Sequence, residues 1–136
     1  MKHKTSELSG ALLDAAVAKA LGMAYEIDLR KLLGYSESMT HFTDVPACKT
    51  EYGYFEPSTS WEQGGPIIER ERIAIVCSRP RFDTNDGRRW DAYFDGRYTG
   101  PDGQVDCNGD ISEGATPLVA AMRSFVTAKL GAETDL

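Results

Sequence analysis

The chain has 136 residues, of which 41% are hydrophobic and 26% are charged, a length that suits one core and predicts a single domain over residues 1–136. Its formal net charge of −6 argues against a nucleic-acid partner held on a basic surface, because such binding depends on neutralising phosphates. No apolar run could span a bilayer and residues 1–10 carry no secretion signal, so we expect a cytoplasmic protein without a membrane partner.

The first predicted element is an amphipathic helix over residues 6–21. Its apolar stripe consists of Leu8, Leu12, Leu13, Ala16, Val17 and Ala20. Asp14 falls outside this stripe, and Gly22 suits the left-handed position at which many helices end. A short strand is predicted at residues 23–27. Residues 28–55 show no clear element, so we expect a less regular excursion there.

Residues 56–72, EPSTSWEQGGPIIERER, contain the most unusual stretch of the chain. Pro57, Ser58 and Thr59 are typical of a turn. Gly64, Gly65 and Pro66 favour a tight corner, because glycine tolerates backbone angles that other residues resist. On this interpretation the corner leads into a strand that begins at Ile67 and Ile68.

The same stretch also permits a loop that holds a ligand. The indole of Trp61 offers a flat apolar face, and the amide of Gln63 both donates and accepts hydrogen bonds, which suits a nucleobase. Consecutive amides around Gly64 and Gly65 could form a small anion-binding concavity. Seven arginines between positions 70 and 97, beginning with Arg70, could bind phosphate, although ordinary pairing with nearby acids is the alternative.

Later elements are more regular. The β-rich run at residues 73–77 and the alternating RRWDAYF at 88–94 predict strands, with a turn at 83–87 between them and a loop at 98–110 after them. A terminal helix should follow the capping residue Thr116 and end at Gly131. Helices at both ends with strands between them predict an α+β fold, in which a small antiparallel sheet packs against the N-terminal and C-terminal helices.

The sequence indicates no metal site, no cofactor and no catalytic group. Cys48, Cys77 and Cys107 are widely spaced and fit neither a disulfide framework nor a zinc site, so we expect reduced thiols. His41 has no partner at ligand spacing. No nucleophile, phosphate-loop or dinucleotide motif is present.

Four segments in this order resemble the NinX-like proteins of bacteriophages and prophages, a small family of unknown function. They are TSELSGALLDAAVAKALG, YFEPSTSWEQGGPIIERE, WDAY and GATPLVAAMRSFVTAKLG. The resemblance covers most of the chain and is weakest at residues 28–51. It implies a phage accessory protein in the host cytoplasm and brings no catalytic residues with it.

Our leading hypothesis is a non-enzymatic binder that sequesters a small nucleotide-like molecule, such as a host defence signal. The candidate binding residues are Ser58, Thr59, Trp61, Gln63, Gly64, Gly65, Pro66, Arg70, Trp90 and Arg123. Two alternatives remain open: a protein-interaction module that inhibits a host protein through a strand edge and the 28–55 excursion, and a metal-dependent nucleotide hydrolase. An uncovered sheet edge would also permit a homodimer.

Overall fold

The computed structural model describes residues 1–35, 40–77, 89–99, 104–106 and 111–136. Its helical elements are η1 (Thr5–Glu7), α1 (Gly10–Ala20), α2 (Trp61–Glu71) and α3 (Pro117–Leu130). Its strands are β1 (Lys2–Lys4), β2 (Tyr25–Tyr35), β3 (Thr40–Thr50), β4 (Gly53–Tyr54), β5 (Ala74–Cys77), β6 (Trp90–Tyr93), β7 (Arg97–Thr99), β8 (Gln104–Asp106), β9 (Ser112–Gly114) and β10 (Glu133–Asp135). All described strand pairs are antiparallel, which confirms the predicted α+β fold.

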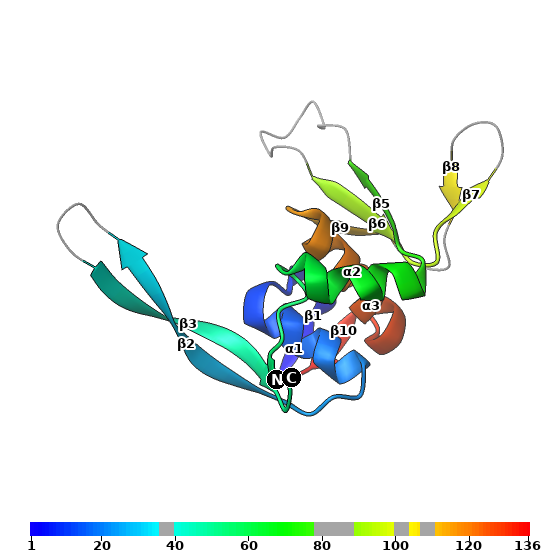
Figure 1. The fold of residues 1–136 in the computed structure, drawn as a ribbon. Helices are drawn as coiled ribbons and strands as arrows, with labels where there is room; N and C mark the ends of the chain where they lie inside the picture. The colour runs from blue at the N-terminus through cyan, green and yellow to red at the C-terminus, as the bar shows by residue number, and fades with distance from the viewer. Residues whose placement is uncertain (36–39, 78–88, 100–103, 107–110) are drawn as a thin grey trace.

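The core lies where α1 and α3 meet, and α2 and the sheet β5–β6–β9 cover it (Figure 1). Its largest fully buried apolar side chains are Leu13, Val17, Met122, Phe125 and Val126. The predicted N-terminal helix is confirmed in position but starts late, because Leu8 and Ser9 have extended backbone between η1 and α1. The chain ends meet in the short pair β1–β10.

The terminal helix is confirmed at its predicted boundaries. The Thr116 hydroxyl accepts the N–H of Val119 at 3.2 Å, and Pro117 occupies the first helical position. Replacing Thr116 by alanine should lower the free energy of unfolding by about 1 kcal/mol, because one helix-end donor loses its acceptor. Urea denaturation measures this loss, and Thr116→Ser, which keeps the oxygen, should retain most of the stability.

Two of the predicted strands are confirmed. β5 covers most of the run 73–77, and β6 lies within the predicted strand 88–94. The third strand of this sheet, β9, pairs with β6 and was not predicted from sequence. Residues 83–87, the predicted turn, and Cys107 lie outside the described residues. Within the predicted loop at 98–110, the described part contains strand β8, which pairs with β7.

The predicted corner and strand at residues 61–68 are wrong, because these residues form most of α2. Gly64, Ile67 and Ile68 follow helical spacing, and this face packs on the core, where Ile67 is buried. Packing therefore outweighs the weak helix propensity of two glycines and an internal proline. The consecutive amides of this stretch do not form the predicted concavity, since Gly64 donates to the Ser60 carbonyl in the first helical turn.

The predicted irregular excursion at residues 28–55 is instead a long hairpin. β2 and β3 pair over all 11 residues of each strand, and β4 adds to β3 only at Lys49 and Thr50. Figure 1 shows this hairpin leaving the helices at its base and extending away from them. We call the part formed by residues 25–35 and 40–50 the arm.

Candidate functional site

The first candidate site lies at the start of α2, where Gln63 holds the preceding loop in place. Its side-chain oxygen accepts the N–H of Glu56 at 2.5 Å, and its side-chain nitrogen donates to the Tyr54 carbonyl at 3.2 Å. Both ends of the amide are thus engaged with the main chain. The predicted role for this amide in recognising a ligand would require it to leave these partners.

The same loop covers a buried carboxyl group, that of Asp14 in α1. Asp14 is only 4% exposed, and its Oδ1 accepts the N–H of Ser58 at 2.8 Å. The pKa of Asp14 is raised to about 6, mainly by burial; contacts with Ser58 oppose the shift, and the charge of Glu56 contributes to it. Although the Ser58 hydroxyl lies close enough to influence this pKa, its buried oxygen has no hydrogen-bond partner within the described residues.

Cys48 of β3 lies in the same region and is fully buried. It packs in a small cluster with Ala15 and Ala18 of α1. Burial, and to a smaller extent the Asp14 carboxylate, raises the pKa of the Cys48 thiol to about 11. A thiol with a raised pKa stays protonated at neutral pH, so the arrangement does not provide a nucleophile.

An arginine of the arm, Arg30, contacts the loop that precedes α2. Arg30 forms an ion pair with Glu56, with Nη1 and Oε1 at 2.6 Å, and lies 4.8 Å from the centre of the Tyr54 ring. This cation was not among the sequence candidates, because residues 28–55 were interpreted as irregular. The alternation of Ile27, Leu29 and Leu33 was the signal that could have placed Arg30 on a strand.

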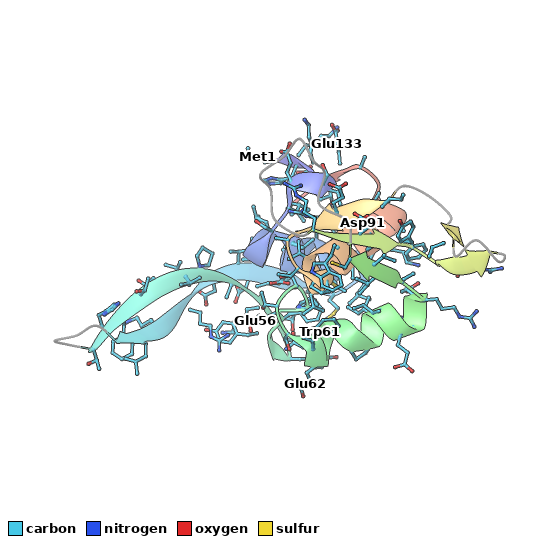
Figure 2. The ribbon with its side chains drawn as sticks, turned by 90° about the horizontal axis from the view of Figure 1, so that it is seen from above. Met1, Glu56, Trp61, Glu62, Asp91 and Glu133 are labelled. Carbon is cyan, nitrogen blue, oxygen red and sulfur yellow. The ribbon has the colours of Figure 1, made fainter. Side chains whose placement is uncertain are left out.

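The remaining candidates near the start of α2 are mostly at the surface. Trp61 is 57% exposed, and Figure 2 shows it in the same region as Glu56 and Glu62. Thr59 and Pro66 are exposed, and space is open beside Gly65. Gly64, by contrast, is buried against Pro57 and Leu118. Ser58, Gln63 and Gly64 therefore lie together at this loop, where they form hydrogen bonds or pack within the protein.

Three of the candidate binding residues lie away from the start of α2. Arg70 lies in the last turn of α2, where its Nε is 3.4 Å from a carboxylate oxygen of Glu71. Trp90 is half-buried in β6 and packs against the core. Arg123 of α3 reaches the carbonyls of Leu8 and Glu113, each at 2.8 Å.

Arg123 lines an open cavity of about 350 Å³ between β9, α3 and the N-terminal segment. Its polar lining includes Ser6, Arg89, Ser112, Glu113, Arg123 and Thr127. Burial and the neighbouring charge of Arg89 both lower the pKa of Arg123. The cavity thus brings two guanidinium groups close together in an otherwise acidic protein.

The arm presents a second unusual surface. Alternation along β2 and the β2–β3 register place five residues on one side of the hairpin. We call this set the arm face: Ile27, Leu29, Leu33, Phe42 and Pro46. Leu29 is 59% exposed and Phe42 is 69% exposed. Near the base the same side is covered by α1, where Cys48 is buried, but farther out no described residue covers it.

Comparison with known proteins places the chain in a family. The model for a family described as "Bacteriophage P22, NinX" matches residues 4–129. The chain belongs to this NinX family. The match includes α1, α2, the whole arm and all of α3 except its last residue, and it confirms the resemblance seen in the sequence. A comparison with curated proteins found no match.

Membership in the NinX family supports the predicted role of a phage accessory protein. The family match itself identifies no catalytic, metal-binding or ligand-binding residue. Among the described residues, no helix is long and apolar enough to cross a membrane.

Proposed function

We propose that this NinX-family protein is a non-enzymatic phage accessory protein that acts by binding a partner protein through the arm face. The observation that carries the proposal is the exposure of large apolar side chains along one side of a hairpin that leaves the core. Scattered apolar residues are common on protein surfaces, but an aligned apolar stripe marks an interaction surface. Aromatic and aliphatic anchors such as Phe42 and Leu29 are the residues around which such interfaces form.

The edges of the arm support the same proposal. β2 pairs only with β3 among the described strands, so its outer edge is open along residues 25–35. β4 covers the other edge only at Lys49 and Thr50. Open backbone donors and acceptors on a long hairpin invite pairing with a further strand, as in β-strand addition.

The polar residues of the arm suggest what the partner can be. Lys31 and Asp44 are exposed and lie opposite one another in the register, in the middle of the apolar stripe. A two-fold axis through this pair would place Lys31 of one copy beside Asp44 of a second copy. A second copy of the chain therefore suits this face, and a host protein is the alternative that the experiment below separates from it.

A nucleotide-like ligand at the start of α2 stays a prediction, with weaker support. Trp61 is accessible there, but Gln63 is engaged with the main chain on both sides and Gly64 is closed off by Pro57 and Leu118. The region also carries the acidic side chains of Glu56 and Glu62, which disfavour a phosphate.

Adjacent residues of β3 provide a matched test. Phe42 lies on the arm face, whereas Thr43 points to the opposite side of the same strand, and both are exposed. Phe42→Asp should weaken partner binding at least about tenfold, since it puts a charge in an apolar contact. Thr43→Asp adds the same charge at the same depth of the arm and should leave binding nearly unchanged.

Binding is measured in two ways with the wild type and both variants. Light scattering gives the mass of the pure protein, and affinity capture from infected host cells gives the amount of any stoichiometric partner. A mass of two chains that only Phe42→Asp reduces identifies a second copy, and a captured host protein lost only with Phe42→Asp identifies a heterologous partner. If both variants retain every association of the wild type, the arm face is not an interface.

A further inference from the structure

The cavity around Arg123 lies away from the arm face, and its residues come from the N-terminal segment, the residue before β6, β9 with the residue before it, and α3 with the segment after it. Its volume of about 350 Å³ is near the lower end of the range for small-molecule sites. Its polar lining combines two guanidinium groups, one carboxylate and three hydroxyls. These groups suit an anionic ligand, and none of them belongs to the arm.

Arg123 is fixed in place before any ligand arrives. Its Nε donates to the Leu8 carbonyl and its Nη1 donates to the Glu113 carbonyl, both at 2.8 Å. These bonds use two of the five N–H groups of the guanidinium, and the other three have no hydrogen-bond partner in the part of the chain that the structure describes. A half-buried guanidinium held by carbonyls is preorganised, so an anion that binds it need not order a flexible side chain.

Arg89 brings a second positive charge to the same place. Its Nη1 lies 3.6 Å from a carboxylate oxygen of Glu113, and both side chains are about half exposed. An exposed pair of this kind contributes little stability, so a dianion can compete with the Glu113 carboxylate for Arg89. The two guanidiniums repel one another, which agrees with the lowered pKa of Arg123. A bound anion would relieve that repulsion.

We infer that this cavity binds a small molecule that carries a phosphate group, with the Arg89 and Arg123 guanidiniums as its anion contacts. Guanidinium groups match the geometry of phosphate oxygens and pair with two of them at once. Three hydroxyl-bearing residues of the lining, Ser6, Ser112 and Thr127, supply further donors. The exposed side chain of Ile111 leaves an apolar edge for the rest of the molecule.

The test titrates the protein with inorganic phosphate and with glycerol phosphate at constant ionic strength, and follows backbone amide signals by NMR. We expect saturable shifts at Ser112, Glu113 and Thr127. Arg89→Gln should weaken phosphate affinity by about tenfold, since it removes a charge-assisted hydrogen bond. Arg70→Gln removes the same charge from the exposed end of α2 and should leave the affinity unchanged.

A second variant separates shape from charge. Arg123→Lys keeps the positive charge but loses the planar fork, so it should also weaken binding, and a melting curve checks that it is folded. Shifts that do not saturate, equal affinity for acetate and phosphate, or equal affinities of Arg89→Gln and wild type would each overturn the inference. Because these measurements do not involve the arm, their outcome is separate from that of the proposed function.

Discussion

Replacing Asp14 by asparagine is expected to stabilise the protein at neutral pH, by about 2 kcal/mol more than it does at about pH 4. In the folded chain burial raises the pKa of Asp14 from 3.8 to about 6. Between these values the unfolded chain releases the proton and the folded chain keeps it. The wild type therefore loses stability as the pH rises through this window, whereas asparagine does not titrate.

Asparagine is a close replacement because its side-chain oxygen can still accept the N–H of Ser58. Urea denaturation of both proteins across the range from about pH 4 to about pH 7.5 gives the difference. Glu69→Gln, at an exposed position of α2, controls for the change in net charge. A difference between Asp14→Asn and wild type that stays constant with pH would show that the Asp14 carboxyl is not buried as described.

The second large effect concerns the two glycines of α2. A Cβ atom at Gly64 would lie 2.7 Å from Cδ2 of Leu118 and would meet the Pro57 carbonyl oxygen still more closely. Gly64→Ala should therefore lower the free energy of unfolding by about 1–3 kcal/mol through overpacking. At Gly65 nothing lies within 4 Å of such an atom, so Gly65→Ala should raise it by about 0.5–1 kcal/mol through helix propensity.

The two substitutions make the same chemical change at neighbouring positions, and thermal or urea denaturation measures both. The sign of the effect is the critical result. If Gly64→Ala were as stable as Gly65→Ala, the contact of α2 with Pro57 and α3 would be looser than the structure shows. If both were destabilising, residues 61–71 would not be helical.

Local signals in the sequence were sufficient for some elements. Thr116 and Pro117 mark the start of α3 by a mechanism that depends only on neighbouring residues, and the alternation around Trp90 and Ala92 marks β6 in the same way. α2 was missed because its stability comes from contacts distant in sequence. Gly64 is helical because it allows close packing on Pro57 and Leu118, and a Gly-Gly-Pro run by itself is typical of a turn.

The arm was missed for a different reason. Its apolar alternation at Ile27, Leu29 and Leu33 is present in the sequence, but Pro46 argues against a strand in the partner segment. The structure explains the exception, since β3 at Pro46 pairs only with β2 and is an edge strand there. Proline is tolerated at an edge because one side of the strand needs no donor.

The candidate site could be predicted only in part. The sequence indicates that residues 56–66 form a distinctive unit. It does not show that the oxygen and the nitrogen of the Gln63 side-chain amide both form hydrogen bonds with the main chain. Asp14 falls on the polar side of the predicted helix, yet the loop at Pro57 and Ser58 covers it. Burial of this kind arises only when distant segments meet.

The most direct test of the arm as a binding surface is site-specific photo-crosslinking in infected cells, with the reactive group placed at position 42 or at position 43. A partner seated on the hydrophobic side of the hairpin predicts one adduct of defined mass from position 42 and little from position 43. Equal adducts from both positions, or none from position 42, would contradict this account.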